Sequence, residues 1–400
     1  MKQTLKKEEL KILFLQTFPL WGGGSGTYTR SLSSEIGKMK DVKTAIVCPE
    51  TQETASELKN VYTLDMPFPC VFVGHPQWPS SRIYKNLTPR EISELYRSFL
   101  ASVIKAVEDF KPDLIHVQHV SLLLWVANFI KSLYGINFVV TAHGTGIKTT
   151  IDNKNYFSLS RDGLRAAKRI IAVSNESKHA LINVFGEEFE KKTKVIPGGI
   201  HLEDYPSEMK IKIINEKYNL NGKKIVLFSG RLTEEKGLNY LISAAKNIRG
   251  DVYIIGDGPE KKNLEDSITK LKLSNVHLLG FMGSDKKEEL KEFYYRSDVV
   301  ILPTVVDEAL GLSIVEAMAA KKPIVATKKG GIPLLVKHEL GGLLIKFKNT
   351  KQIADACNKL LEDEVLRKKM GENARKIIEK NFTWQNISLK ILKIYKKSLN

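Results

Sequence analysis

The chain has 400 residues, of which 42% are hydrophobic and 27% are charged, and it carries a formal net charge of +17. These fractions are ordinary for a soluble globular protein, and the length exceeds what one hydrophobic core organises, so we expect two domains. The charge predicts attraction to polyanions such as nucleotides, nucleic acid or an anionic membrane surface. A lysine-rich solvated surface accounts for most of such an excess.

The cysteines and the hydropathy of the chain indicate its cellular compartment and whether it crosses a membrane. Cys48, Cys70 and Cys357 are far apart and form no Cys-x-x-Cys pair, which argues against a disulfide framework or a zinc site and favours a reducing compartment. The first residues are too charged for a secretion signal, and the most apolar stretch, 120–130, is too short to cross a bilayer. We therefore expect a cytoplasmic protein, soluble or in peripheral contact with an anionic membrane.

In the first half of the chain, short apolar runs alternate with amphipathic segments, which is typical of parallel βαβ units. The helices expected from periodicity lie near 27–40, 90–109 and 176–186. The expected strands are 11–16, 43–48, 113–118, 137–143, 169–174 and 194–197.

The second half restarts the same pattern after a junction near 198–212, which is marked by glycine and proline. The expected strands are 223–230, 252–258, 276–281, 298–304, 322–327 and 342–347. The prediction is an α/β protein of two doubly wound, Rossmann-like domains, 1–205 and 206–383, facing across a cleft at the carboxyl ends of their strands.

A glycine-rich stretch, FPLWGGGSGTYTRSL (18–32), follows the first strand and opens a helix. Glycines such as Gly23 and Gly24 let a phosphate or sugar approach the backbone, and helix N–H groups attract an anion. Thr29 occupies the position where a dinucleotide fingerprint needs its third glycine, and no Walker A pattern is present, so dehydrogenases and P-loop enzymes are disfavoured. A plain tight turn is the alternative.

Two loops of the second half follow its first two strands. In SGRLTEEKGL (229–238), Arg231 and Lys236 could hold a diphosphate, although two cations beside two glutamates also fit a solvated helix start. In GDGPEKKNL (256–264), Gly256 and Gly258 mark a tight turn that is a weak signal by itself.

Histidines stand at two strand ends of the first half. His143 ends the strand in VTAHGTG, where it could bind a sugar or polarise a leaving group, and a capped loop histidine is the alternative. His119 ends IHVQH in a comparable way, whereas His116 alternates onto a sheet face and is expected to be structural.

The segment DEALGLSIVE (307–316) places two carboxylates eight positions apart. Glu308 precedes a helix that starts at Gly311 and Leu312, and Glu316 lies more than one turn into it. The two acids therefore reach different parts of one extended ligand, and the helix start between them offers N–H groups to a phosphate. A capping glutamate with a surface glutamate is the alternative.

In this order the motifs resemble those of retaining glycosyltransferases of family 4 (glycosyl transferases group 1), which have the GT-B fold. The shared patterns are the N-terminal glycines, GRLTEEKG, GDGP, LLGF, the Glu-x7-Glu segment EALGLSIVE, and AMAAKKPIVAT with GGIP. The likeness runs from residue 11 to the C-terminus. The chain departs from the family pattern at PGGIH (197–201), at Leu334 of GGIPLL and at Leu310 of EALG.

The resemblance implies a role for each matched residue. Catalytic positions are Glu308 at the donor sugar, His143 beside the reacting sugar, and Arg231 and Lys236 at the diphosphate leaving group. Glu316 would bind the ribose hydroxyls. The remaining donor contacts would be Gly23, Gly24, Gly256, Gly258, Leu279, Gly280, Phe281, Gly311 and Leu312. The terminal helix, 384–400, would pack back on the first domain.

The function expected is transfer of a hexose from a UDP-, GDP- or ADP-linked sugar to an acceptor hydroxyl, with neither metal nor cofactor. The acceptor, whether a sugar, a lipid-linked molecule or a small molecule, would contact the first domain, with His119 and His75 as candidates. A GT-B nucleotide-sugar epimerase is the alternative enzyme. A nucleic-acid-binding protein, suggested by charge alone, lacks the clustered cations and interleaved aromatics that it needs.

Overall fold

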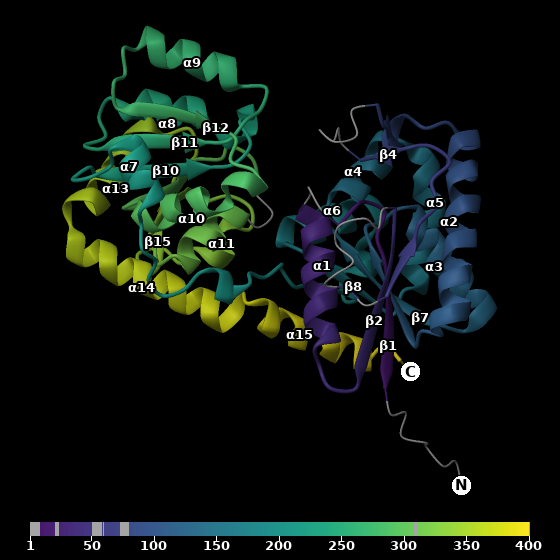
Figure 1. Ribbon diagram of the computed structural model, residues 1–400. Helices are drawn as coiled ribbons and strands as arrows, with labels where there is room; N and C mark the ends of the chain where they lie inside the picture. The colour runs from purple at the N-terminus through teal and green to yellow at the C-terminus, as the bar shows by residue number, and fades with distance from the viewer. Residues whose placement is uncertain are drawn as a thin grey trace. The chain divides into compact units, whose positions relative to one another are not determined.

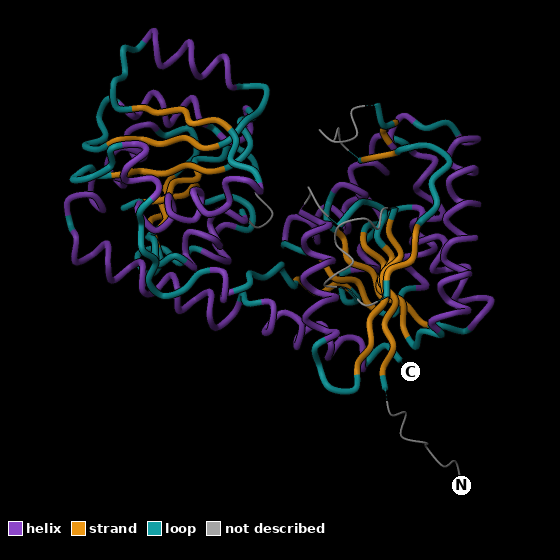
Figure 2. Tube along the Cα trace, viewed as in Figure 1, coloured by secondary structure: helices purple, strands orange, loops and turns teal. Residues whose placement is uncertain are grey.

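The fold is that of a computed structural model, which describes residues 9–20, 24–49, 58, 60–72, 80–307 and 311–399. The chain divides into two compact units. Unit 1 holds Met1–Gly199 and Trp384–Asn400, and unit 2 holds Ile200–Thr383 (Figure 1). In both units the strands form a parallel sheet with helices packed beside it (Figure 2).

Unit 1 is built on a seven-stranded sheet of order β3-β2-β1-β6-β7-β8-β9 in which every pair is parallel. A separate parallel pair joins β4 (Cys70–Val71) to β5 (Arg82–Ile83). The strands of the main sheet are β1 (Leu10–Leu15), β2 (Val42–Cys48), β3 (Val61–Thr63), β6 (Leu114–Gln118), β7 (Asn137–Ala142), β8 (Arg169–Ala172) and β9 (Thr193–Val195).

Helices cover both faces of this sheet. Alternate residues of β1 show the two faces, because Leu13 and Leu15 pack with the core under α2, α3 and α6, whereas Ile12 and Phe14 pack with α1 and α15. The helices of unit 1 are α1 (Gly24–Gly37), α2 (Pro89–Phe110), α3 (Leu122–Tyr134), α4 (Thr145–Asp152), α5 (Phe157–Ala166), α6 (Asn175–Phe185) and α15 (Trp384–Lys396).

Local sequence explains where the longest of these helices begins and ends. Thr88 caps α2 through a capping box with Glu91, and Pro89 supplies the fixed φ that suits a first helical position. The helix ends at Phe110, and the next residue, Lys111, adopts a left-handed φ of 52°. Seven buried apolar residues follow one side of α2 and hold it on the sheet.

The C-terminal helix α15 belongs to unit 1 and lies beside α1 (Figure 1). Trp384, Ile387 and Ile391 are buried against the sheet. The buried His116 ring fixes the far end of the helix, since its Nδ1 lies 2.6 Å from the Tyr395 hydroxyl and its Nε2 lies 2.7 Å from Thr141 Oγ1. His116 is thus a structural residue.

Unit 2 has a six-stranded parallel sheet of order β12-β11-β10-β13-β14-β15. Its strands are β10 (Ile225–Ser229), β11 (Asp251–Ile255), β12 (Val276–Gly280), β13 (Val299–Leu302), β14 (Ile324–Thr327) and β15 (Gly342–Ile345). Its helices are α7 (Ile213–Tyr218), α8 (Leu238–Ala245), α9 (Lys261–Lys270), α10 (Lys287–Arg296), α11 (Leu312–Ala319), α12 (Ile332–Leu335), α13 (Thr350–Glu362) and α14 (Glu364–Asn381).

Most of these helices contact one another in one continuous series, because α13 also contacts α14. Helix α8 contacts α9 and α13, while α10 contacts α7 and α11, and α11 contacts α14 (Figure 1). The order turns in both directions from β10, as a doubly wound sheet requires. Both units are therefore Rossmann-like, which is the predicted α/β architecture.

Unit 2 begins at Ile200, six residues before the predicted start of the second domain at residue 206. Ile200 forms a parallel bridge with Thr383, and its N–H donates to the Phe382 carbonyl at 2.8 Å. Tyr205 is buried in the unit 2 core. The sequence predicts a loop at this junction, and the structure shows that contacts of Ile200 and Tyr205 with unit 2 fix its position.

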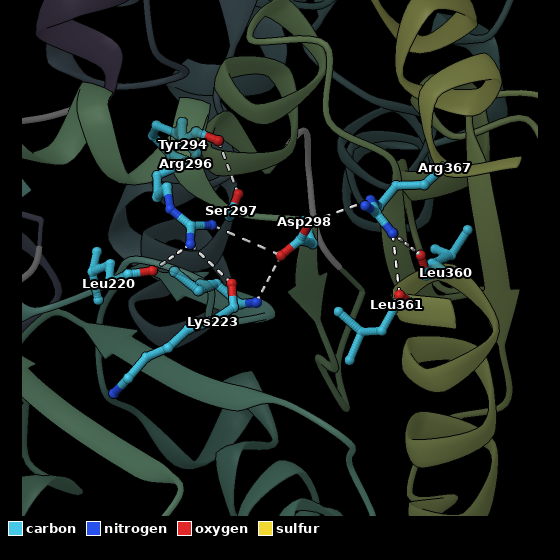
Figure 3. A network of polar contacts seen from close by, with 10 residues as sticks. Leu220, Lys223, Tyr294, Arg296, Ser297, Asp298, Leu360, Leu361 and Arg367 are labelled. Carbon is cyan, nitrogen blue, oxygen red and sulfur yellow. Dashed lines mark hydrogen bonds and ion pairs between the residues drawn. The ribbon is translucent and has the colours of Figure 1, made fainter. Parts of the chain in front are cut away.

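A charged network at the amino ends of β10 and β13 ties several elements of unit 2 together (Figure 3). Asp298 accepts from the Ile225 N–H at 2.8 Å and pairs with Arg367 at 3.3 Å. Arg296 donates to the carbonyls of Leu220 and Lys223. The strands begin at this edge, so the network leaves their carboxyl ends open for a site.

Cys48, Cys70 and Cys357, all of which the structure describes, are buried and form no disulfide with one another. Among the residues that the structure describes, none of the helices has both the length and the apolar character that a bilayer crossing demands.

Candidate functional site

Backbone hydrogen bonds join the loops that follow β10, β11 and β12 in unit 2. The Gly230 N–H donates to the Ile255 carbonyl at 3.0 Å, and the Gly256 N–H donates to the Gly280 carbonyl at 2.8 Å. The parallel ladder therefore continues one residue beyond β10 and one residue beyond β11. These hydrogen bonds hold the backbone of the loops at the carboxyl edge of the sheet in place, and we call this backbone surface the floor. Doubly wound domains bind ligands at this edge.

Two of the predicted glycines are required by this close packing. A Cβ on Gly256 would lie 1.8 Å from the Gly230 carbonyl oxygen, and one on Gly258 would lie 2.4 Å from the Leu232 carbonyl oxygen. Both have positive φ, 150° and 159°. These positions accept only glycine, because neighbouring loops occupy the space of a side chain.

The cation-bearing loop between β10 and α8 is fixed on the end of β13. A Cβ on Gly237, whose φ is 67°, would lie 2.2 Å from the Pro303 carbonyl oxygen. The Thr304 hydroxyl donates to the Glu235 carbonyl at 2.9 Å. Sequence reasoning used Lys236 but did not identify this adjacent glycine.

The two predicted cations differ in exposure. Arg231 is exposed, and its side chain forms no hydrogen bond or ion pair with the described residues. Lys236 is half-buried. The same loop, residues 230–237, thus presents an unpaired guanidinium beside a rigid backbone floor, which suits an anionic ligand.

Leu279 and Gly280 are the last residues of β12, and Phe281 follows the strand. Gly280 has a φ of 77°, and after this turn Phe281 is 68% exposed, which is high for a phenylalanine. An exposed ring at the carboxyl end of a strand offers a flat apolar surface for a planar ligand.

The third loop leads into α11. Gly311 precedes the helix with a φ of 66°, and Leu312, its first residue, is 48% exposed. Glu308 and Leu310 lie outside the described residues. The structure therefore describes the helix start and Glu316 from the predicted Glu-x7-Glu segment.

Glu316 is the best-defined charged group of this edge. The Tyr294 hydroxyl donates to its Oε2 at 2.7 Å, and the Tyr205 hydroxyl forms a second hydrogen bond to the carboxylate. Burial raises the pKa of the Glu316 carboxyl, while both tyrosines and the Lys287 charge act in the opposite direction. Sequence reasoning missed both tyrosines.

The corresponding edge of unit 1 is lined by neutral side chains. Gln16 follows β1 and Gln118 ends β6, next to each other in the parallel register, and both are fully buried. Gln16 Oε1 accepts from the Thr29 hydroxyl at 3.0 Å. The Nε2 groups of both glutamines have no hydrogen-bond partner among the described residues, so two buried donors remain available there.

The two predicted histidines meet at this edge. Their rings lie 4.6 Å apart between centroids, and His143 Nε2 lies 2.9 Å from Gln118 Oε1. Burial lowers the pKa of His143 to about 3 and the pKa of His119 well below its usual value. His119 also has a left-handed φ of 77°. Both rings are therefore neutral hydrogen-bonding groups near pH 7.

The glycine-rich stretch enters the structure at Gly24, which is exposed and starts α1 three residues before the predicted helix. A Cβ at Gly24 would meet none of the described residues within 4 Å, whereas one at Gly26 would lie 2.5 Å from the Pro19 carbonyl oxygen. Packing thus requires Gly26 and leaves Gly24 open to a ligand. Gly23 and His75 lie outside the described residues.

The chain is similar to known glycosyltransferases in both of its halves. A family model described as "Glycosyltransferase Family 4" matches residues 22–204, and one described as "Glycosyl transferases group 1" matches residues 210–377. An uncharacterised glycosyltransferase of Methanocaldococcus jannaschii is 31% identical over 308 residues, which cover 72% of this chain and 75% of that protein. A second one from the same organism is 26% identical over 97% of this chain and 98% of its own.

Among solved structures, the Anabaena protein HepE in complex with UDP is similar in fold. The TM-score is 0.74 at 22% identity, and the match covers 97% of this chain and 100% of that one. With two parallel doubly wound units and these relatives, the protein belongs to the family 4, group 1 glycosyltransferases of GT-B fold.

Proposed function

We propose that this glycosyltransferase moves a hexose from a nucleoside-diphosphate sugar to an acceptor hydroxyl, with retention of the anomeric configuration and without a metal ion. The observation that carries the proposal is the carboxyl edge of unit 2. There Arg231, which has no side-chain partner among the described residues, and the hydrogen-bonded carboxylate of Glu316 accompany loops whose glycines place no side chain over the backbone.

The charge distribution of this edge suits a diphosphate leaving group. Cleavage of the bond between the anomeric carbon and the phosphate oxygen builds negative charge on that oxygen, so fixed positive potential lowers the barrier. We assign this role to Arg231 and Lys236, with the N–H groups at the start of α11 beside Gly311. Because these groups are cationic already, the proposal needs no divalent ion.

The donor nucleotide is supported by a neighbour in fold. Structures of the Anabaena protein were solved with UDP and with UDP-glucose. In this chain we assign Glu316 to the ribose hydroxyls, Phe281 to one side of the base, and Glu308 to the hydroxyls of the donor sugar. UDP, GDP and ADP all carry the diphosphate and ribose that these residues would bind.

We place the acceptor at the neutral edge of unit 1. Gln16, Gln118 and His119 each keep a buried nitrogen without a partner among the described residues, and such groups bind hydroxyl or carboxylate oxygens well. We assign the reacting sugar to His143. During transfer the acceptor oxygen bonds to the anomeric carbon and its proton passes to the departing phosphate oxygen, so charge and atoms balance.

An assay of products tests the proposal. The protein is incubated with UDP-, GDP- and ADP-hexoses and a panel of sugar, lipid-linked and small-molecule acceptors, with and without EDTA. We expect a glycosylated product of retained configuration by NMR, in equal yield with EDTA. A product of inverted configuration, or a yield abolished by EDTA, would contradict the mechanistic part.

The same assay separates the alternative enzyme. A GT-B nucleotide-sugar epimerase is not favoured, because the related proteins are named as glycosyltransferases. An epimerase would convert the sugar nucleotide when no acceptor is present. The proposal predicts at most slow hydrolysis under that condition, and accumulation of an epimeric sugar nucleotide would overturn it.

A further inference from the structure

The hydrogen-bond partners of Glu316 come from two places that are distant in the sequence. Tyr294 lies on α10 and is fully buried, and Tyr205 lies near the start of unit 2 and is 7% exposed. Each phenol donates its hydroxyl to the carboxylate, at 2.7 Å from Tyr294 Oη to Oε2. Hydrogen bonds to an ionised carboxylate are stronger than those between neutral groups.

The Tyr205 side chain is held although it follows an irregular segment. Arg375, which is buried, donates to the Tyr205 carbonyl and also to the Ala319 carbonyl at the end of α11. Tyr295 donates to the carbonyl of Pro206. These contacts fix the backbone on both sides of the phenol, so its hydroxyl is preorganised rather than carried by a free loop.

Tyr294 connects the carboxylate to the cation-bearing loop. Its phenol also hydrogen-bonds the side chain of Ser229, the last residue of β10, and Arg231 stands only two positions further along. A chain of side chains therefore runs from Ser229 through Tyr294 to Glu316. It sets the position of the carboxylate relative to the strand end that precedes Arg231.

The number of acceptor sites on the carboxylate points to its ligand. A carboxylate has about four lone-pair directions, and two phenols use two of them. The remaining two match a pair of adjacent hydroxyls, which a ribose presents at its 2′ and 3′ positions. Glu316 is half-buried, so a ligand can still reach it.

We infer that Tyr205 and Tyr294 are positioning residues that orient Glu316 for the two ribose hydroxyls, and that they determine the preference for ribonucleotides over deoxyribonucleotides. This inference rests on the proposed function, since it takes a nucleoside diphosphate as the ligand. It extends that function by assigning ribose selectivity to two residues that do not themselves contact the nucleotide.

The test measures binding of UDP, GDP and ADP and of their 2′-deoxy counterparts by calorimetry. For the wild type we expect at least one ribonucleotide to bind roughly tenfold or more tightly than its deoxy counterpart, because a hydrogen bond to a charged group is lost. In Tyr205→Phe and Tyr294→Phe this ratio falls by about threefold or more, mainly through weaker ribonucleotide binding. Adding either substitution to Glu316→Gln changes the ratio no further.

Tyr218→Phe is the matched control, because it also removes a hydrogen bond from a tyrosine to a glutamate, that of Tyr218 to Glu289 at 3.2 Å. It leaves the ratio unchanged. A circular dichroism melt identifies any variant that fails to fold, and for such a variant Ser229→Ala, which breaks the same chain at its other end, replaces it with a smaller expected loss of the ratio.

The outcomes distinguish failure of the proposed function from failure of the inference about Tyr205 and Tyr294. If none of the three nucleoside diphosphates binds the wild type, the proposed function fails and the inference with it. If the wild type prefers the ribonucleotide but folded Tyr205→Phe and Tyr294→Phe keep the full ratio, the inference alone is overturned. An equal loss in Tyr218→Phe would also overturn it, because the effect would then be nonspecific.

Discussion

The carboxyl edges of the two sheets have the same architecture and opposite chemistry. In unit 2 the edge is formed by glycine-containing loops, with Arg231 exposed and Glu316 held by two phenols. In unit 1 it is formed by Gln118 and two histidines that burial keeps neutral. The fold thus provides the position of a site, and the side chains at the strand ends decide which ligand it suits.

The difference has a physical cause. A diphosphate needs cations and backbone N–H groups within reach, so bulky side chains near the floor would exclude it. A polyhydroxyl ligand is distinguished by neutral donors and acceptors at fixed positions, and burial strengthens such groups because water does not compete. We therefore assign the donor to unit 2 and the acceptor to unit 1.

The largest expected effect is on turnover. Arg231→Ala, Lys236→Ala and Glu308→Ala should each lower kcat by about 10²–10³-fold, because each removes a group that would stabilise the transition state. The matched control is Arg249→Ala, which removes an exposed arginine paired with Glu362. Near-normal kcat in all three site variants, measured with their melting temperatures unchanged, would contradict the charged edge of unit 2.

Acid should destabilise unit 1 through its neutral histidines. The pKa values of His116 and His143 are lowered to about 3 by burial, below the value of about 6.5 in the unfolded chain. Between these values the unfolded state binds more protons, so stability is complete above pH 6.5 and is lost as pH falls, by at most about 1.4 kcal/mol per pH unit for each histidine. Unfolding titrations of the wild type and His116→Asn at pH 4–7 check this, and an unchanged slope in the variant would contradict it.

A smaller effect, on folding stability, contrasts the two glycine regions. Gly256→Ala should lower the free energy of unfolding by about 1–3 kcal/mol, because the new Cβ would meet the Gly230 carbonyl in a backbone conformation that alanine avoids. Gly24→Ala, with open space around the Cβ, should leave stability within about 0.5 kcal/mol of wild type. Equal denaturation midpoints for the two variants would argue against the tight loop packing of unit 2.

The smallest expected effect concerns the contact between His116 and Tyr395, which holds the far end of α15 on the sheet. Tyr395→Phe removes the hydroxyl that lies 2.6 Å from His116 Nδ1 and leaves a buried ring nitrogen without that partner, at a cost of about 1 kcal/mol or somewhat more. Hydrogen exchange of α15 amides should speed up more than exchange in unit 2. Uniform acceleration across the chain would show that the contact is not local.

Much of the fold was predictable from sequence because its strands are buried on both faces and read as short apolar runs. Of the thirteen strands described in the two main sheets, twelve were predicted. Strand β3 was missed because none of its three residues is buried and they form no apolar run. Helix α3 was noted only as an apolar stretch, since seven of its residues are buried and no polar face marks a period. The start of α1 at Gly24 was missed because glycine has a low helix propensity, so the sequence pattern predicted a later start.

The candidate site was predictable only in part. Glu316, Arg231 and the glycines belong to short sequence motifs, which can be recognised in a single sequence. Tyr205 and Tyr294 lie 111 and 22 positions before Glu316, and nothing in their local pattern distinguishes them from core aromatics. Only the packing of α10 and of the segment after Ile200 brings their hydroxyls to the carboxylate. Gln16 and Gln118 were missed for the same reason, because their pairing depends on strand register.

The most direct test of the central claim is a thermal-shift screen of the wild type and Arg231→Ala with UDP, GDP, ADP and their hexose conjugates. A ligand that binds only the native state raises the melting temperature. We predict a clear rise with at least one nucleoside diphosphate and its sugar, largely lost in Arg231→Ala. No rise with any of these compounds, or an equal rise in the variant, would contradict a nucleotide-sugar site at the carboxyl edge of unit 2.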